Sequence, residues 1–156
     1  MSVEILNESG VELDVAEFAK LTRFTLRQLR VHPQAELCLK LVDEATIAEF
    51  NHRYLGTEGP TDVLSFPMDE LRPGHEGEPE EEGILGDMLL CPQYAAEQAP
   101  RFSRSVDDEL HLLTIHGILH LLGYDHAEAD EERAMFALQE RLLAEWQRFR
   151  KGGEVA

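Results

Sequence analysis

Residues 116–126 read His116-Gly117-Ile118-Leu119-His120-Leu121-Leu122-Gly123-Tyr124-Asp125-His126. His116 and His120 are four residues apart, so they share one face of a helix with about 3.6 residues per turn. Gly123 can end this helix and turn the chain back, because glycine accepts a left-handed backbone. His126 then lies where it can join the pair. Three imidazoles predict a divalent-metal site whose fourth tetrahedral position stays open, as in catalytic rather than structural zinc sites.

The alternative interpretation is that these histidines are ordinary core residues of a buried helix. Most residues between them are apolar, so each imidazole left without a partner would cost about 1–3 kcal/mol. A bound metal ion removes this cost for the two imidazoles on the helix. The segment therefore favours a metal-dependent hydrolase over a purely structural helix.

The composition fits one small globular domain. The chain has 156 residues, 43% of them hydrophobic, and no apolar run of about 18 residues, so we expect no membrane span. Its first residues lack the basic and apolar regions of a signal peptide. Cys38 and Cys91 have no CxxC or zinc-finger spacing and are expected to be buried thiols in a reducing cytosol. The predicted location is the cytoplasm.

Charge is distributed unevenly along the chain. The formal net charge of −17 argues against DNA or a broad nucleic-acid surface, because phosphate binding needs local positive charge. Residues 69–82 concentrate acidic side chains among proline and glycine and are expected to form a solvated loop. Arg23, Arg27 and Arg30 recur along one expected helix, and Arg101 and Arg104 lie close together. These arginines either form a local basic surface or belong to ordinary solvated helix faces.

Hydrophobic periodicity and turn signals predict the order of the elements. Strands are expected at residues 3–7, 36–42, 62–66 and 84–91, and helices at 14–31, 43–53, 92–99, 105–122 and 128–149. The fold class is α+β, a single domain over residues 1–150 with one small mixed sheet of about four strands packed against about five helices. The helix at 105–122 is apolar nearly all round, which predicts a central, buried helix that carries the metal ligands. Residues 151–156 are expected to be a disordered tail.

Local signals also set the expected helix starts and the core face of the last helix. Asp14 and Ser105 are predicted N-caps, each followed three residues later by an acidic residue. Six residues of the last helix are expected to face the core: Met135, Phe136, Leu138, Leu142, Leu143 and Trp146.

Four segments together are similar to one known family. Residues 116–126 fit the signature HGxLHLxGYDH at every fixed position, and residues 60–67 read PTDVLSFP. Residues 85–88 read LGDM, close to a family strand LGDI, and Met135 with Gln139-Glu140 resembles its last helix. By these segments the chain resembles the YbeY family of bacterial rRNA-maturation endoribonucleases over most of residues 37–143. The resemblance implies a zinc-dependent endoribonuclease domain that acts on single-stranded RNA in maturation of the 3′ end of small-subunit rRNA.

The same resemblance implies the cofactor and partners. One Zn²⁺ per chain would be held by His116, His120 and His126, and the partners would be rRNA, the small ribosomal subunit and assembly factors. Ser65, Asp87 and Asp125 are candidate catalytic residues: Ser65 and Asp87 could line the cleft, and Asp125 could orient a ligand imidazole. The alternatives are that Asp87 is an outward-facing strand residue and that Asp125 is a turn residue bonded to its own backbone.

One segment departs from the family pattern. Many members have an arginine in a pattern like NxxYRG, but residues 51–56 read NHRYLG and place Leu55 at that position. Arg53 is a candidate RNA-binding substitute only if the helix has ended, because helix residues two apart point about 200° apart. Otherwise Arg53 is a surface residue.

Two other functions remain open on the sequence alone. Zinc peptidases also use two histidines on a helix, but there a glutamate follows the first histidine as general base, and here that position is Gly117. A non-catalytic, zinc-containing ribosome-assembly factor is the second alternative, favoured by Leu55 and by the net charge of −17.

Overall fold

The computed structural model describes residues 2–31, 34–69, 83–125 and 128–153. Its elements follow in the order β1 (Ser2–Asn7), α1 (Val15–Gln28), β2 (Glu36–Leu41), α2 (Glu44–Leu55), β3 (Val63–Pro67), β4 (Ile84–Leu90), α3 (Pro92–Gln98), the 3₁₀-helix η1 (Ala99–Phe102), α4 (Val106–Leu121) and α5 (Ala129–Gly153). The expected four strands and five helices are confirmed, and η1 is an additional short turn. Almost all of the expected acidic loop lies outside the described residues.

The strands form one mixed sheet in the order β1-β2-β4-β3. β1 pairs with β2, and β2 with β4, in parallel, whereas β3 and β4 are antiparallel. Parallel neighbours need a crossover connection, which α1 provides between β1 and β2. The predicted α+β class with a single mixed sheet is confirmed.

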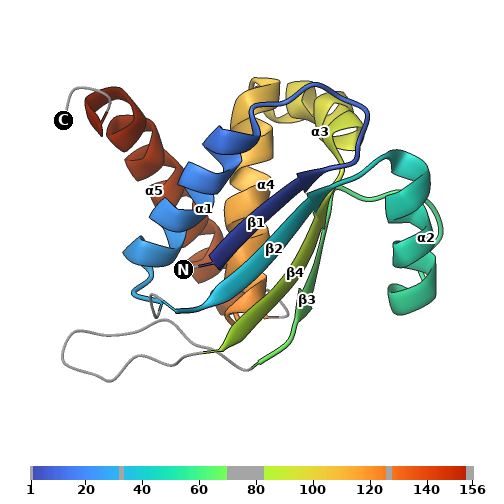
Figure 1. Cartoon of the computed structure of the whole chain (residues 1–156), viewed down its shortest axis with the longest axis horizontal. Helices are drawn as coiled ribbons and strands as arrows, with labels where there is room; N and C mark the ends of the chain where they lie inside the picture. The colour runs from blue at the N-terminus through green and yellow to red at the C-terminus, as the bar shows by residue number, and fades with distance from the viewer. Residues whose placement is uncertain (1, 32–33, 70–82, 126–127, 154–156) are drawn as a thin grey trace.

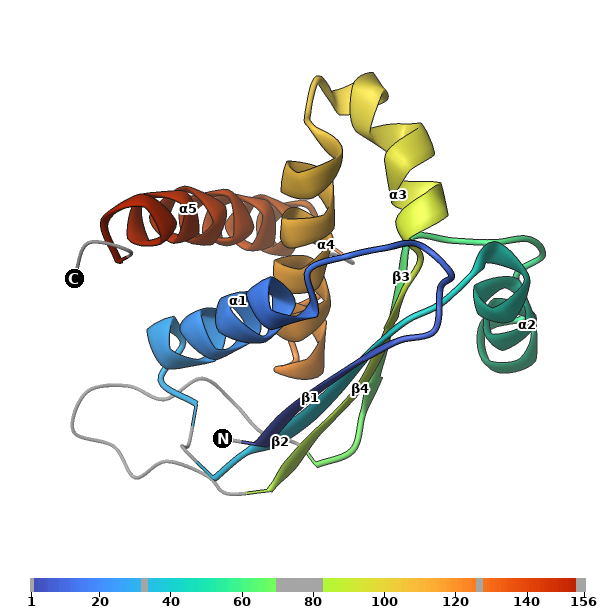
Figure 2. The same ribbon diagram turned by 45° about the horizontal axis from the view of Figure 1, so that its top comes forward.

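Helices cover both faces of this sheet (Figure 1). The main core, which includes Leu39 and Ile118, lies between the sheet and α1, α4 and α5. On the other side α2 covers a smaller cluster that contains Ile47, Leu64 and Leu89 (Figure 2). Most side chains of α4 are buried, which confirms its central place. No helix within the described ranges is both long and apolar enough to cross a membrane.

Two glycines allow α4 to lie close to the sheet. A Cβ on Gly117 would overlap the Met88 Cε atom. A Cβ on Gly86 would overlap the backbone oxygen of Phe66 and lie 2.9 Å from Leu121, and Gly86 also has a φ of +147°. Gly86 and Met88 therefore form the α4-facing side of β4, because side chains alternate along a strand.

The helix starts agree with the local signals, but two helix ends and one core residue do not. The Asp14 and Ser105 side chains cap α1 and α4 as predicted. α1 ends at Gln28, earlier than expected, where Arg30 takes a left-handed φ of 55°. α5 continues to Gly153, so the expected disordered tail is wrong for residues 151–153, where Lys151 is a favourable cation at a helix C-terminus. Residues 154–156 lie outside the described residues.

Phe136 is the one predicted core residue of α5 that the structure leaves exposed, with 39% of its surface accessible. Met135, Leu142, Leu143 and Trp146 are buried, and Leu138 packs at the edge of the core. Phe136 lies beside this stripe and lines a cavity instead.

Candidate metal centre and the cavity beside it

Two of the three predicted metal ligands meet on α4. The Nε2 atoms of His116 and His120 are 3.0 Å apart, and their ring planes are nearly perpendicular, at 81°. This pairing follows from their spacing of one helical turn. Two nitrogens on a tetrahedral zinc, each about 2.0–2.1 Å from the ion, would lie at a similar separation. The pair therefore fits a shared metal ion.

A buried glutamine on α5 fixes the tautomer of His116. The Nδ1 atom of His116 lies 2.7 Å from the Oε1 atom of Gln139, whose side chain is buried. Because a carbonyl oxygen only accepts, Nδ1 carries the proton and donates it. The Nε2 lone pair of His116 is then directed to the partner imidazole, as a metal ligand requires.

The predicted turn after α4 is present. Gly123 has a φ of +92°, its N–H donates to His120, and the N–H of Tyr124 donates to Leu119. This pair of bonds is a Schellman motif. His126 lies outside the described residues, so its place as third ligand stays a prediction.

Asp125, the other polar residue of the turn, is exposed. Its predicted role in orienting a ligand also stays a prediction. Among the residues that the structure describes, no three His, Cys, Asp or Glu side chains gather into a metal site.

Ser65 connects β3 to the histidine helix. Its Oγ donates to the backbone oxygen of Gly117 at 2.9 Å, between the two histidines in sequence. Ser65 thus lies near the pair, as predicted for a cleft residue, and it also fixes the distance between β3 and α4. Its predicted catalytic role stays a prediction.

Asp87 and Arg53 are not brought to the histidines. Asp87 is exposed on β4 and, by strand alternation, lies on the face opposite Met88 and α4. Arg53 pairs with Glu49 at 2.8 Å on the exposed surface of α2. α2 runs on through Leu55, so Arg53 and Leu55 point in different directions. The roles predicted for Asp87 and Arg53 receive no support from their positions.

A cavity of about 330 Å³ opens beside His116. It is lined by residues of α4 and α5, among them Glu109, Phe136 and Gln139, and by Arg104. Its volume is at the lower end of the range for small-molecule sites. The cavity gives the histidine pair a place where part of a substrate can lie.

Glu109 is the residue of this cavity that sequence reasoning missed. Its side chain is only 2% exposed, and its Oε2 atom has no hydrogen-bond partner among the described residues. Burial raises the pKa of the Glu109 carboxyl, an effect that Arg104, 3.5 Å away, partly offsets. Glu109 precedes His116 by seven residues, two turns along the same face, and this spacing was the signal available in the sequence.

His111 lies on the side of α4 away from the His116–His120 pair, where α4 packs against α1 and α5. Its Nε2 lies 3.0 Å from the Oε1 of Glu17 on α1, and its ring packs edge-on against Phe18 and Trp146. Burial lowers the pKa of His111. His111 is a core residue and does not face the His116–His120 pair, because five helix residues place it about 140° around the helix from His116.

The fold and the site define a single-domain α+β protein with a candidate metal centre on its central helix. The family model described as Endoribonuclease YbeY matches residues 4–147, and the chain belongs to this family. Proteins named endoribonuclease YbeY from Nocardioides sp. and Thermobifida fusca are 60% identical over 146 residues and 59% identical over 148 residues. These matches cover 94% and 95% of this chain and 98% and 96% of the relatives.

More distant comparisons agree. A Mycobacterium tuberculosis protein of the same name is 54% identical over 148 residues, covering 94% of this chain and 84% of the relative. A solution structure of a Thermotoga maritima protein superposes with a TM-score of 0.63 at 28% identity, covering 96% of this chain and 93% of the other. The family resemblance expected from the four sequence segments is confirmed.

Proposed function

We propose that this chain is a zinc-dependent endoribonuclease that cleaves single-stranded RNA during rRNA maturation, at the 3′ end of small-subunit rRNA. The observation that carries the proposal is the meeting of two imidazole Nε2 atoms, 3.0 Å apart, on the central helix of a chain from an endoribonuclease family. We further propose that it works in the cytoplasm with the small ribosomal subunit and assembly factors as partners. The names of the relatives favour this function over a peptidase or a non-catalytic factor.

The proposed ligands are His116, His120 and His126. Their neutral imidazoles suit zinc, which would act as a Lewis acid toward a phosphoryl oxygen. The Gln139 oxygen accepts a hydrogen bond from the Nδ1–H group of His116 and so holds this ring in the orientation that a ligand needs.

The cavity beside His116 is proposed to receive the RNA backbone. The Arg104 guanidinium supplies positive charge there, held between Glu109 and Glu140 at 3.5 and 2.8 Å. Burial raises the pKa of the Glu109 carboxyl, which weakens the repulsion that this group would exert on a phosphate in the cavity. Gly117 offers no side chain as general base, so the attacking group must be activated elsewhere.

The test combines metal content with RNA cleavage. Protein purified without added metal is expected to hold about one equivalent of zinc by elemental analysis and to cleave a 3′-extended small-subunit rRNA precursor. His116→Ala and His120→Ala should lose both properties, because each removes a ligand. His52→Ala is the matched control, since His52 is exposed on α2 and contacts Glu58. Less than a tenth of an equivalent of any transition metal, or cleavage that survives both histidine changes, would contradict the proposal.

A further inference from the structure

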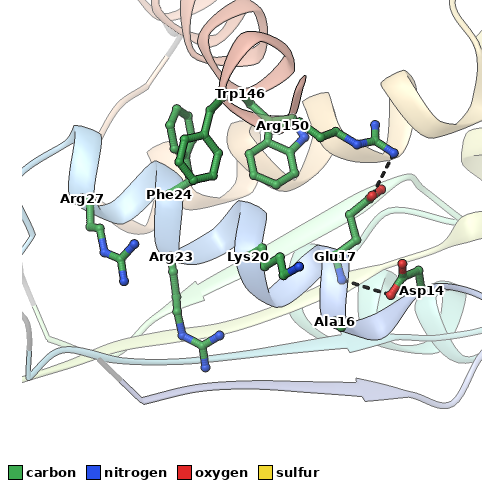
Figure 3. Close-up of a pocket in the computed structure, with 10 residues that line it drawn as sticks. Asp14, Ala16, Glu17, Lys20, Arg23, Phe24, Arg27, Trp146 and Arg150 are labelled. Carbon is green, nitrogen blue, oxygen red and sulfur yellow. Dashed lines mark hydrogen bonds and ion pairs between the residues drawn. The ribbon is translucent and has the colours of Figure 1, made fainter. Parts of the chain in front are cut away.

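A second cavity, with a distinct chemical character, lies away from the histidines. It has a volume of about 470 Å³ and lies between α1 and α5 (Figure 3). It shares no lining residue with the cavity beside His116. Any role of this cavity is therefore separate from the His116–His120 pair.

Positive charge collects at this cavity although the chain as a whole carries a net charge of −17. Lys20, Arg23, Arg27 and Arg150 line it, four of the 14 Lys and Arg residues in the chain. Figure 3 shows Lys20, Arg23 and Arg27 projecting from α1. None of these three forms an ion pair with a carboxylate in the described part of the chain, whereas Arg150 pairs with Glu17 at 2.8 Å.

The two carboxylates at the cavity are already engaged. Glu17 binds Arg150 through Oε2 and contacts His111 through Oε1. Asp14 accepts from the backbone N–H of Glu17 as the cap of α1. Lys20, Arg23 and Arg27 are thus left to attract an anion from outside.

Aromatic rings from both helices also line this cavity, Phe24 from α1 and Trp146 and Phe149 from α5. The rings of Phe24 and Phe149 stack with centroids 4.9 Å apart, and Trp146 lies 5.6 Å from Phe24. Phe24 and Trp146 are buried, but Phe149 is 46% exposed and offers a ring surface at the rim. The Nε1 atom of Trp146 is buried and has no hydrogen-bond partner among the described residues.

Cations beside an exposed aromatic ring are the combination that binds single-stranded nucleic acid, because phosphates pair with the cations and bases stack on the ring. We infer that the cavity between α1 and α5 is a second RNA-contact site, which holds a nucleotide of the single-stranded substrate at a distance from the histidines. The inference rests on the proposed function for the identity of the RNA. Lys20 and Arg27 lie about 10 Å apart along α1, so they suit more than one phosphate.

The second site should raise affinity for long RNA more than for short RNA. A segment that reaches only the histidines gains nothing from the α1–α5 cavity, whereas a longer one engages both places. The expected kinetic signature of removing the cavity is a higher KM for long substrates with little change in kcat.

The chain contains a built-in probe, because Trp146 is its single tryptophan and lines the cavity. Titration with a single-stranded RNA oligonucleotide is expected to change the Trp146 fluorescence. The same change should occur in His116→Ala, which separates this site from catalysis. Arg23→Ala/Arg27→Ala should weaken binding by at least tenfold and reduce the log–log salt slope by roughly 0.7 for each phosphate that no longer has a cationic partner. Phe149→Leu should weaken binding without changing the salt slope.

The matched control is Arg133→Ala/Arg141→Ala, which removes the same charge from exposed positions on α5. It should leave binding within about twofold of the parent, since its arginines do not line the cavity. RNA binding and cleavage with no change in fluorescence, or equal decreases in affinity for the two double variants, would overturn the second site while leaving the nuclease intact. Displacement of RNA by inorganic phosphate at equal concentration would overturn nucleotide recognition in favour of a simple anion site. A fluorescence change in a protein that cleaves no RNA would instead uphold the second site and count against the proposed function.

Discussion

Gln139 determines what the His116 ring can do. Its amide oxygen accepts a hydrogen bond from the protonated Nδ1, which leaves the Nε2 lone pair directed to the His120 imidazole. Gln139→Leu should lower zinc affinity about 10- to 100-fold, the usual effect of removing a group that orients a ligand. Gln139→Glu keeps an acceptor in the same place and should bind zinc nearly as tightly as the parent. Competition with a chromogenic chelator measures both, and equal affinity in the leucine variant would show that Gln139 does not orient the ring.

Glu109 provides a prediction on pH. Burial raises the pKa of its carboxyl in the folded state, so the folded protein holds this proton more firmly than the unfolded chain. The resulting stabilisation is complete below the unfolded pKa, near 4.5, and is lost as the pH rises through the higher folded value. Glu109→Gln removes this loss.

The melting temperature of Glu109→Gln relative to the parent should therefore rise between pH 4.5 and 7.5. A change of about 1 kcal/mol corresponds to roughly 2–4 °C in a chain of this size. Thermal unfolding at several pH values tests this, with Glu140→Gln as an exposed comparison. A difference that shrinks with rising pH would mean that attraction to Arg104 outweighs the effect of burial.

At the scale of elements, the approach of α4 to the sheet depends on two glycines of different tolerance. At Gly117 a new Cβ meets the end of the flexible Met88 side chain, which can move. At Gly86 it meets the backbone oxygen of Phe66, which cannot, and the φ of +147° adds strain. We expect Gly117→Ala to cost up to about 2 kcal/mol and Gly86→Ala clearly more.

Chemical denaturation of the two glycine variants gives their free energies of unfolding. Met88→Leu should recover part of the stability that Gly117→Ala removes, because it deletes the overlapping methyl group. It should recover none of the stability that Gly86→Ala removes. If Gly117→Ala were the less stable variant, the backbone of β3 at Phe66 would adjust more easily than the Met88 side chain.

Elements were predictable where the signal was local. Asp14 and Ser105 mark helix starts because a short polar side chain satisfies the free N–H groups there, and Gly123 marks an end because it accepts a left-handed backbone. The end of α1 at Gln28 was missed, since Arg30 takes a left-handed conformation without being glycine. The local sequence carries little information about which non-glycine residue takes a left-handed conformation.

The site was predictable only along one helix. The spacing of His116 and His120 implies their meeting, but Gly117 suggested only a missing base, while the structure shows it as a packing contact with the sheet. α4 is apolar nearly all round, so its sequence does not reveal which side meets which neighbour. Glu109 could have been found from its spacing of seven residues to His116, but its burial depends on the neighbours of α4. The positions of Asp87 and Arg53 depend on strand alternation and helix length, which emerge only in the assembled fold.

For the whole molecule, metal binding should be coupled to stability. The proposed ligands come from α4 and from the segment that leads to α5, so an ion there would join two parts of the fold. A chelator should lower the melting temperature of the parent, since a ligand that binds only the folded state stabilises it. Re-addition of zinc should restore it. His116→Ala/His120→Ala should melt at one temperature with or without chelator, and a chelator effect of parental size in that variant would place the metal elsewhere.

α5 carries Gln139 at the histidine pair and Phe149 at the α1–α5 cavity, on one unbroken helix. Ten residues of helix set these two points about 15 Å apart along its axis. The α5 helix therefore sets a fixed distance between the proposed RNA-contact cavity and the proposed cleavage site. With one nucleotide bound in the α1–α5 cavity, the position of the cut would be set by the number of nucleotides from that one, independent of the bases between. Inserting one residue between Gln139 and Phe149 would lengthen this separation by only about 1.5 Å but rotate Phe149 by about 100°, away from the α1–α5 cavity.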